Sequence, residues 1–313
     1  MTVRVSIAIA AYKAADYLEK AVRSALTQTE QDIEVVIVDD CSPDATCAIA
    51  HKLAAEDARV HVVALPKNVG GAGALNRAID AAQGEWVAVL DADDWYEPTR
   101  IEKLLTAAEW AGVDMVADNQ HFVDARLGRS VRTAFARTYH NRTINVNDFL
   151  QHTDPTAAFD YGQLKPMFRK AFLQGHGIRY QEEFRDGFDY FMLFDYFLAG
   201  GKALLVDEPL YYYLQPFGSV SKQWAQVERK RYPFEKIKLY NDKVILKRQF
   251  DMTPEQIQAM LRRGKGFEVM ARLHKVREEL AANNVAGAVQ HALTAPPAFW
   301  LQVVKRGLAR LAA

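Results

Sequence analysis

Two kinds of apolar periodicity alternate along the first 120 residues. Near-continuous apolar runs predict strands that are covered on both faces, and apolar residues three and four apart predict helices between them. Strands are expected at residues 3–11, 33–38, 60–65, 86–90 and 113–117. Helices are expected to begin at the capping-box-like pair Asp16 and Glu19, to cover 46–55 and 72–82, and to run from Pro98 to residue 111. This alternation predicts an α/β fold with a mostly parallel sheet, whose ligands gather at the carboxyl ends of the strands.

The pattern changes in the rest of the chain. Residues 121–165 are irregular and are expected to form loops and short helices over the sheet. Further elements are expected as a helix at 188–198, short strands at 203–206 and 210–214, and helices at 223–249, 254–282, 285–293 and 298–311. We therefore expect one domain over residues 1–221, divided into halves 1–120 and 121–221, followed by a basic helical region over 222–313.

Charge divides the chain at the same place. The 313 residues carry 39 Lys and Arg and 39 Asp and Glu, so the formal net charge is zero. Residues 1–221 hold 21 basic and 31 acidic residues, whereas residues 222–313 hold 18 basic and 8 acidic ones. Neutrality argues against a nucleic-acid partner for the whole chain. The basic region leaves open contact with an anionic lipid surface or with the chain's own acidic domain.

Two further observations bear on location. The two cysteines, Cys41 and Cys47, cannot form a disulfide framework and do not make a CxxC pair. The N-terminus lacks the basic region of a signal peptide, and no run approaches the ~18 apolar residues of a membrane-spanning helix. We therefore expect a cytoplasmic protein, whose membrane contact would be peripheral, on the inner face of the cell membrane.

Acidic residues follow two of the predicted strands. Asp91 and Asp93 come directly after the strand at 86–90, and alternate residues at a strand end can face one site. Their carboxylates would be hard oxygen ligands for Mg²⁺ or Mn²⁺, which offsets charge on a leaving diphosphate. Asp39 and Asp40 follow the strand at 33–38, where a carboxylate could accept a hydrogen bond from a nucleobase N–H or a ribose hydroxyl. Either pair could instead cap a turn or a helix.

A glycine-rich segment, NVGGAGALN at residues 68–76, precedes a predicted helix. Glycine permits close approach of the backbone, and a helix N-terminus favours anions. The spacing is not that of a dinucleotide-binding GxGxxG loop, because Asn76 stands at the last glycine.

In order and spacing, these segments resemble the motifs of glycosyltransferase family 2. Ser6 and Tyr12 match the S-x-x-x-P-x-Y-N opening, in which Ala10 replaces the proline and Lys13 the asparagine. The segment VDDCSPDAT resembles VDDGSTDGT, with Cys41 at the glycine. The glycine-rich segment resembles N-x-G-x-x-x-A-R-N without the arginine, and LDADDWYEP at residues 90–98 is a close match.

Later segments extend the resemblance to about residue 221. KPMFRKAFL at 165–173 resembles a segment of exopolysaccharide- and succinoglycan-type members. DEPLYYY at 207–213 and GSVS at 218–221 resemble the closing segment of the family. Tyr211 to Tyr213 could stack on a sugar ring, although alternating aromatic residues of a strand are more often core.

The resemblance implies the GT-A fold and an inverting, metal-dependent transferase. The donor would be a nucleotide-diphospho-sugar, most simply UDP-linked, and the acceptor a saccharide of a cell-surface polysaccharide or exopolysaccharide, which could be lipid-linked. A Mn²⁺ or Mg²⁺ ion would be held by Asp93 and Asp91, with Asp93 the more direct ligand. The nucleotide sugar would be bound by Ala10, Tyr12, Asp39, Asp40, Asn68, Asn76, Asp91 and Ala92.

Inverting transfer also needs a general base for the acceptor hydroxyl. In the family a Glu-Asp pair that opens a helix supplies it, and FRDGFDY at residues 184–190 is the corresponding segment. One register places Asp189 at the base. The rival register places Asp186 at the glutamate and leaves no carboxylate at the base. Either side chain could instead cap the helix.

The segment 298–313, which contains the last predicted helix, has an aromatic and aliphatic face with Phe299, Trp300 and Val304, and a basic face with Lys305 and Arg306. Such a helix could lie in an anionic membrane interface. It could equally dock on the catalytic domain or on a second copy in a homodimer.

Two other functions share parts of this pattern. A nucleotidyltransferase has a similar acidic site, but it would carry a glycine-rich basic loop after the first strand, and residues 11–15 contain no glycine. The second alternative is a non-catalytic nucleotide-sugar-binding or assembly protein, because several motifs differ from those of the family.

Overall fold

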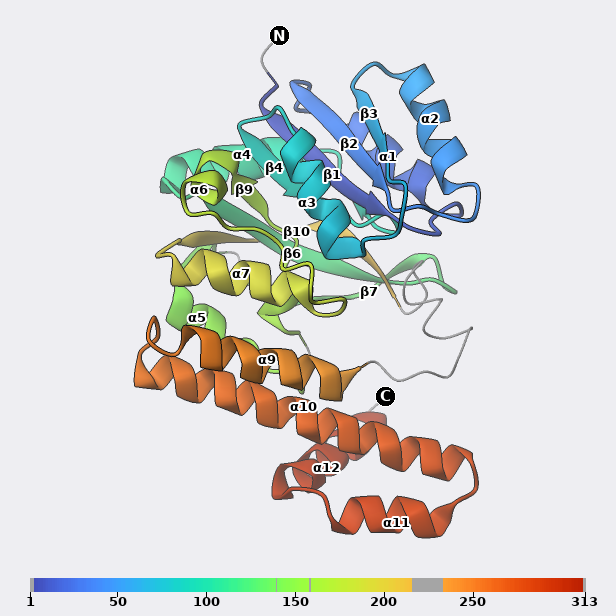
Figure 1. The fold of residues 1–313 in the computed structure, drawn as a ribbon, viewed down its shortest axis with the longest axis vertical. Coiled ribbons are helices and arrows are strands. Elements are labelled where there is room, and N and C mark those ends of the chain that lie inside the picture. Colours follow the sequence, from blue (N-terminus) through green and yellow to red (C-terminus); the bar gives the residue numbers. More distant parts are fainter. Residues whose placement is uncertain (1–2, 139, 158, 216–232, 312–313) are drawn as a thin grey trace. The chain divides into compact units, whose positions relative to one another are not determined.

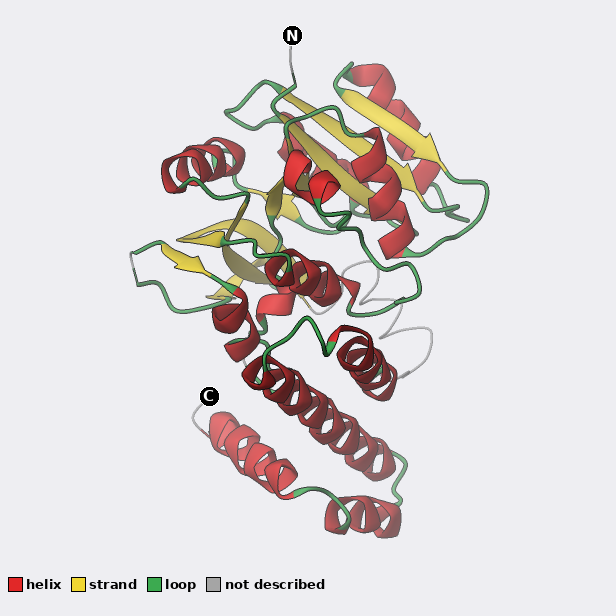
Figure 2. Cartoon of the chain, turned by 60° about the vertical axis from the view of Figure 1, so that its left-hand side comes forward, coloured by secondary structure: helices red, strands yellow, loops and turns green. Residues whose placement is uncertain are grey.

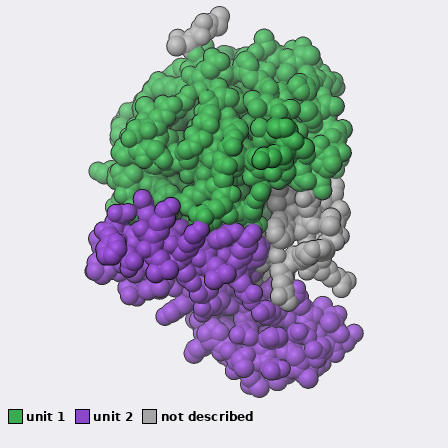
Figure 3. Space-filling view, in the orientation of Figure 1, with its two compact units in different colours: residues 1–149, 161–229 green, residues 150–160, 230–313 purple. Residues whose placement is uncertain are grey.

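The computed structural model describes residues 3–138, 140–157, 159–215 and 233–311, with the side chains of the last helix as far as Val304. The chain forms two compact units, which Figure 3 shows in different colours. Unit 1 comprises residues 1–149 and 161–229, and unit 2 comprises residues 150–160 and 230–313. The segment 150–160 therefore belongs to the helical unit and not to the domain in which the sequence pattern placed it.

One mixed sheet organises unit 1 (Figure 1). Its strands, in spatial order, are β3 (Val60–Ala64), β2 (Ile33–Asp39), β1 (Val5–Ala11), β4 (Trp86–Val89), β9 (Met167–Arg169), β6 (Met115–Asp124), β10 (Ala203–Gln215) and β5 (Trp95–Tyr96). The first four are parallel, β9 runs antiparallel between β4 and β6, and β10 is parallel to β6. Two short strands, β7 (Arg129–Thr133) and β8 (Arg142–Ile144), pair with β6 and β10. The predicted α/β fold with a mostly parallel sheet is confirmed.

Helices cover the sheet (Figure 2). On one face, alternate β1 residues Val5, Ile7 and Ile9 share a core with α1 (Leu18–Leu26), α2 (Thr46–Glu56) and α4 (Arg100–Ala111). Helix α3 (Gly71–Ala81) contacts β1 and β2 through residues outside that core. Helix α5 (Val146–Gln151) begins in unit 1 and its last two residues belong to unit 2. The remaining helices of unit 1 are the short η1 (Tyr161–Gln163), α6 (Lys170–Gly175) and α7 (Phe188–Leu198). Burial on both faces explains the near-continuous apolar runs of the central strands.

Several predicted boundaries are wrong. The N-cap of α1 is Tyr17, whose side chain caps nothing, so the capping box at Asp16 does not form. Helix α4 begins at Arg100, two residues after Pro98. Two predicted short strands are one strand, β10, whose register shifts on both sides of Pro209, because proline has no N–H for the ladder.

Unit 2 is helical within the described residues. Its helices are α9 (Phe234–Arg248), α10 (Pro254–Ala281), α11 (Val285–Leu293) and α12 (Pro297–Leu311). A capping box between Thr253 and Gln256, with Pro254 at the first helical position, starts α10. The buried Arg263 of α10 bonds to Asp160 and to the Thr153 carbonyl, which ties segment 150–160 to this helix. Of the predicted helix at 223–249, the part before residue 233 lies outside the described residues.

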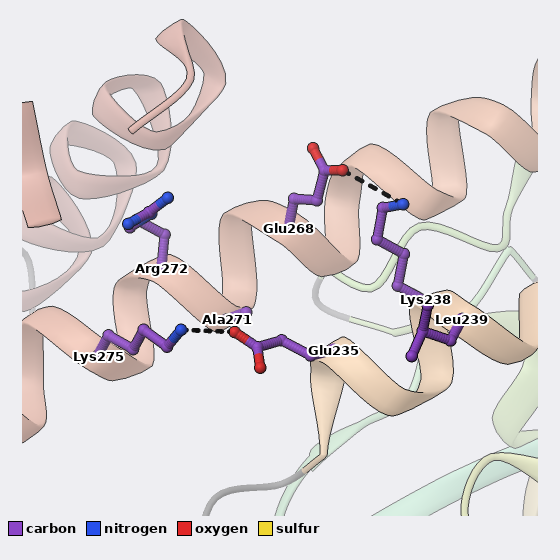
Figure 4. Close-up of a pocket in the computed structure, with 7 residues that line it drawn as sticks. All are labelled: Glu235, Lys238, Leu239, Glu268, Ala271, Arg272 and Lys275. Carbon is purple, nitrogen blue, oxygen red and sulfur yellow. Dashed lines mark ion pairs between the residues drawn. The ribbon is translucent and has the colours of Figure 1, made fainter. Parts of the chain in front are cut away.

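A surface hollow lies between α9 and α10 (Figure 4). Two ion pairs cross it, Lys275 to Glu235 at 2.6 Å and Lys238 to Glu268 at 3.4 Å. Since these charges compensate one another across a helix interface, the hollow is not a candidate active site. Among the described residues, no helix is both long and apolar enough to cross a membrane.

Candidate active site

The acidic residues lie at one edge of the sheet in unit 1. Strand β1 lies between β2 and β4. Asp39, the last residue of β2, is in register with Ala11 of β1, and the Leu90 N–H bonds to the Ala8 carbonyl at the end of β4. The two acidic strand ends are thus separated by one strand, or roughly 10 Å at the usual strand spacing. This is the edge where ligands gather in parallel sheets.

Three aspartates after β4 form a tight cluster. Asp91, Asp93 and Asp94 each offer a carboxylate oxygen, and these oxygens lie within 4.8 Å of one another. Both oxygens of Asp94 are engaged, one by the Tyr211 hydroxyl at 2.7 Å and one by the Leu214 N–H at 2.8 Å. Burial, and then the neighbouring Asp93 and Asp91, raise the pKa of Asp94 well above its usual range. Carboxylate oxygens such as those of this cluster are the donors that a hard divalent cation prefers.

Lys165 connects this cluster to the acceptor-side carboxylate. Its Nζ lies 2.7 Å from Oδ2 of Asp91 and 3.0 Å from Oδ2 of Asp189, and its side chain is 5% exposed. Burial opposes the positive charge, but Asp189 and Asp91 outweigh it and raise the pKa of the ammonium well above its usual range. One buried cation thus joins two carboxylates from segments about 100 residues apart in sequence.

Asp189 lies in the first turn of α7. The N-cap of this helix is Gly187, with a φ of 68°, in the left-handed region that glycine adopts readily. Burial raises the pKa of the Asp189 carboxyl, Lys165 opposes the shift, and Asp91 adds to it. A raised pKa makes a carboxylate a stronger base. Asp186 lies in the loop before α7, and the Asp189 carboxylate is the one that Lys165 joins to Asp91.

The aspartates after β2 have different surroundings. Both oxygens of Asp40 accept backbone N–H groups, from Val69 at 2.6 Å and Gly70 at 2.8 Å. Asp39 accepts the Ser42 N–H on Oδ2, while its buried Oδ1 has no hydrogen-bond partner among the described residues. A buried acceptor without a donor costs free energy, so Oδ1 of Asp39 is suited to an incoming N–H or hydroxyl.

Loop 182–188 packs on the glycine-rich start of α3. A Cβ on Gly70 would collide with Arg185, and one on Gly71 would approach Phe188 to 2.8 Å. The Nη1 of Arg185 lies 3.4 Å from the side-chain oxygen of Asn68, whose amide bonds to the Asp40 carbonyl. Gly70 also has a φ of 85°, so its backbone conformation favours glycine as well, and at both positions a side chain would have to displace Arg185 or Phe188.

Asn76 is 2% exposed, and its amide pairs with the backbone of Tyr180 in both directions, at 2.8 and 3.0 Å. These bonds anchor the segment before α7, and the nucleotide contact of Asn76 stays a prediction.

The comparison with protein families agrees with this geometry. The model described as "Glycosyl transferase family 2" matches residues 6–174. The chain belongs to glycosyltransferase family 2. The match includes both acidic strand ends and Lys165, and it stops before Asp189.

Curated relatives support the assignment. The succinoglycan biosynthesis protein ExoO of Rhizobium meliloti is 33% identical over 295 residues, which are 93% of this chain and 82% of ExoO. ExoU of the same organism, also a succinoglycan biosynthesis protein, is 37% identical over 190 residues, 59% of this chain and 54% of ExoU. This glycosyltransferase therefore matches about half of the length of ExoU and most of ExoO.

Solved structures show the same fold. Residues 1–349 of Staphylococcus aureus TarS in complex with UDP-GlcNAc align with a TM-score of 0.61, covering 91% of this chain and 89% of that chain at 18% identity. The predicted GT-A fold is thereby confirmed.

The other predicted nucleotide-binding residues lie along the same edge. Ala10 is half-buried near the end of β1, Tyr12 follows that strand and is also half-buried, and Ala92 is 5% exposed between the two aspartates. The Nζ of Lys13 lies 5.4 Å from the centre of the Tyr12 ring. The predicted GSVS segment lies outside the described residues.

Three residues support the site in a role that the sequence did not indicate. Tyr211 is fully buried, and its hydroxyl contacts the Asp91 N–H as well as Asp94, so it supports the acidic cluster from the core. Arg100 and Asp118 form a buried ion pair at 2.6 Å, and the Arg100 guanidinium also bonds to the Lys165 carbonyl. Lys165 lies in a recognisable sequence motif, but the motif does not indicate which residues the lysine contacts.

Two departures from the family motifs stand at positions with a left-handed backbone. Lys13 and Cys41, which replace the asparagine and the glycine, have φ angles of 52° and 58°. Asparagine and glycine are the residues that enter this left-handed region most easily. At both positions this chain therefore carries a residue that is less suited to a left-handed backbone than the residue of the family motif.

We expect Cys41→Gly to stabilise the protein. Relief of left-handed strain is worth about 1–2 kcal/mol, and the greater freedom of glycine in the unfolded chain removes roughly 0.5–1 kcal/mol of that. Thermal or urea unfolding should show a net gain of about 0.5–1 kcal/mol. Cys41→Ala is the matched control, since it removes the thiol but keeps the Cβ, and a similar gain in both variants would rule out the strain argument.

Proposed function

We propose that this glycosyltransferase transfers a sugar, with inversion, from a UDP-sugar to a saccharide acceptor in the synthesis of a cell-surface polysaccharide or exopolysaccharide. The observation that carries the proposal is the convergence of Asp39, the Asp91–Asp93 pair and Asp189 on one edge of the sheet. The names of ExoO and ExoU support the polysaccharide context, and the UDP-GlcNAc complex of TarS supports the donor class.

The donor half would be bound by the carboxylates after β2 and β4. Oδ1 of Asp39 would accept the N–H of the uracil ring, while Asp40 and Asn68 hold the glycine-rich segment around it. Asp91 and Asp93 would hold a Mg²⁺ or Mn²⁺ ion, which would offset the negative charge of the departing diphosphate. Asp94 and Tyr211 support these two aspartates from the core.

The acceptor half would be served by Asp189. Its carboxylate would take the proton from the acceptor hydroxyl as the hydroxyl oxygen forms a bond to C1 of the sugar. The bond between C1 and the diphosphate oxygen breaks on the opposite face, and the electron pair leaves with UDP. In-line geometry of this kind requires the base and the diphosphate to lie on opposite sides of C1. Asp189 and Asp91 are separate carboxylates that share the Lys165 ammonium, so the proposed base is a different side chain from the proposed ligand of the cation.

A panel of nucleotide sugars tests the donor assignment. Thermal unfolding of the whole chain is measured with Mn²⁺ and each UDP-, GDP- or dTDP-sugar. At a ligand concentration 100 times its dissociation constant, binding stabilises the folded state by about 2.7 kcal/mol. We expect a UDP-sugar to give the largest shift. The donor assignment fails if no nucleotide sugar stabilises the protein. Binding without transfer to any acceptor would favour a non-catalytic binding protein.

We further propose that α12 rests on an anionic membrane surface at the inner face of the cell membrane. Phe299 is 1% exposed and packs with Val269 and Leu273 of α10, so this side chain docks the helix and does not face lipid. The neighbouring Leu301 and Val304 are 57% and 56% exposed. Exposed apolar side chains on a helix rich in Lys and Arg suit a charged lipid interface.

We expect the double variant Leu301→Glu, Val304→Glu to float less with anionic vesicles of phosphatidylglycerol. Both side chains are exposed, so thermal stability should be unchanged. Trp110→Glu in unit 1, where the tryptophan is 84% exposed, is the matched control for an added charge at an exposed apolar residue. Equal flotation of all three proteins would rule out the membrane contact, and a shift from dimer to monomer in light scattering would assign this face to a homodimer.

A further inference from the structure

The buried ammonium group of Lys165 occupies an unusual position between the two halves of the site. Each of Asp91 and Asp189 gives it one carboxylate oxygen, at 2.7 and 3.0 Å. Because both oxygens contact the same nitrogen, the two carboxylates cannot lie further apart than these two contacts allow. The geometry therefore couples the position of the acceptor-side carboxylate to that of the donor-side cluster.

The backbone of Lys165 is itself held rigidly. Its carbonyl accepts a hydrogen bond from Nη2 of Arg100 at 2.6 Å, and Arg100 is fully buried in its ion pair with Asp118. Two residues later, Met167 begins β9, which pairs with β4, the strand that leads to Asp91. The lysine thus projects from a fixed point of the sheet, whereas Asp189 comes from the start of a helix that follows a loop.

We propose that Lys165 is a positioning residue that sets the separation and orientation of Asp189 relative to Asp91. The inference rests on the proposed transferase function. Without the ammonium, the two carboxylates would repel each other in a poorly solvated site, and Asp189 would turn away from the acceptor hydroxyl. A misplacement of about 1 Å is enough to lower the rate roughly 100-fold.

Kinetics of three variants of the whole chain and a double-mutant cycle test the proposal. Lys165→Met removes the charge and keeps the length, Lys165→Arg restores a cation that can bridge two carboxylates, and Lys170→Met is the control. Lys170 is a half-buried lysine on the same segment whose ammonium bonds to the Ala82 carbonyl. Binding of UDP with Mn²⁺ is measured by calorimetry, and kcat and the donor KM are measured for transfer. Thermal unfolding of Lys165→Met, Asp189→Asn and the double variant gives a double-mutant cycle.

We expect Lys165→Met to lower kcat about 100-fold, with UDP affinity and donor KM within about threefold of wild type, and Lys165→Arg to recover part of the loss. Lys170→Met should keep the wild-type kcat. The cycle should be non-additive, because removing Asp189 also removes part of the repulsion that Lys165 offsets. An additive cycle overturns the bridge. An unchanged kcat, an equal loss of UDP affinity, or no recovery with arginine overturns the positioning role. The double-mutant cycle measures stability and needs no substrate. If the wild type binds no nucleotide sugar, the proposed function is wrong, and the cycle still tests whether Lys165 bridges the two carboxylates.

Discussion

Asp189→Asn should abolish nearly all sugar transfer. A positioned general base contributes about 10²–10⁴-fold to a rate, and asparagine keeps the size of the side chain but cannot take the acceptor proton. We expect kcat to fall about 10³-fold, while UDP binding with Mn²⁺ stays near the wild-type value, since Asp189 lies on the acceptor side of Lys165. Initial rates at saturating donor, together with calorimetry of UDP, measure the two effects separately.

Asp186→Asn is the matched control. The substitution is chemically identical and lies three residues earlier, in the loop before α7. We expect it to retain most of the activity. If Asp186→Asn loses more activity than Asp189→Asn, the alternative register of this segment is the right one and the base has been misassigned.

The pH profile adds a second readout of the same residue. A general base works only when it is deprotonated, so kcat should rise with pH as the Asp189 carboxyl loses its proton. Burial raises the pKa of this carboxyl, so the acidic limb should lie above the ordinary aspartate value of about 3.9. The limb should be absent from the residual activity of Asp189→Asn. The same limb in both proteins would assign it to another group.

The first half of the fold could be predicted because its strands are buried on both faces. Residues of β1 and β2 are almost all buried apolar side chains, and such runs have few alternatives to a central parallel strand. The prediction failed at β6, which continues to Asp124 through a polar stretch that suggested a loop. Asp118, Asn119 and Gln120 are each at most 1% exposed, and their side chains bond to Arg100, the Phe135 carbonyl and the Gln163 carbonyl. Hydrophobic periodicity cannot detect buried polar residues whose partners lie far away in sequence.

In the candidate site, too, the sequence pattern does not show which groups a side chain contacts. The sequence indicated two acidic clusters, but not how each cluster divides its tasks. Both carboxylate oxygens of Asp40 and of Asp94 accept hydrogen bonds from other residues of unit 1. Asp39, in contrast, has a buried oxygen without a hydrogen-bond partner among the described residues. Residue type and spacing are identical for the two tasks, and only tertiary contacts with Gly70 or Tyr211 separate them. Lys165 was missed for the same reason, since its two partners lie 74 residues before it and 24 residues after it.

This division of tasks leads to a contrast between neighbouring aspartates. Asp93→Ala should remove the metal-dependent part of donor binding, because it deletes one of the two carboxylates that would hold the cation. The variant should also be slower, because the cation stabilises the departing diphosphate. A loss of about 3 kcal/mol of this stabilisation lowers the rate roughly 100-fold, and we expect kcat to fall at least that much. Wild type should bind UDP more tightly with Mn²⁺ than with EDTA, whereas Asp93→Ala should bind equally weakly in both.

Asp94→Asn is the control, since burial raises the pKa of Asp94 well above its usual range and favours the neutral carboxyl that asparagine imitates. The contacts of Asp94 with Tyr211 and Leu214 are structural, so we expect this variant to lose up to about 1–3 kcal/mol of stability and to keep the effect of Mn²⁺ on UDP binding. If Asp93→Ala keeps the Mn²⁺ effect and Asp94→Asn loses it, the cation is held by the buried carboxylate, and the assignment of this cluster must be reversed. If Mn²⁺ has no effect on the wild type, the diphosphate is neutralised by protein cations, of which Lys165 lies nearest to Asp91 among the described ion pairs.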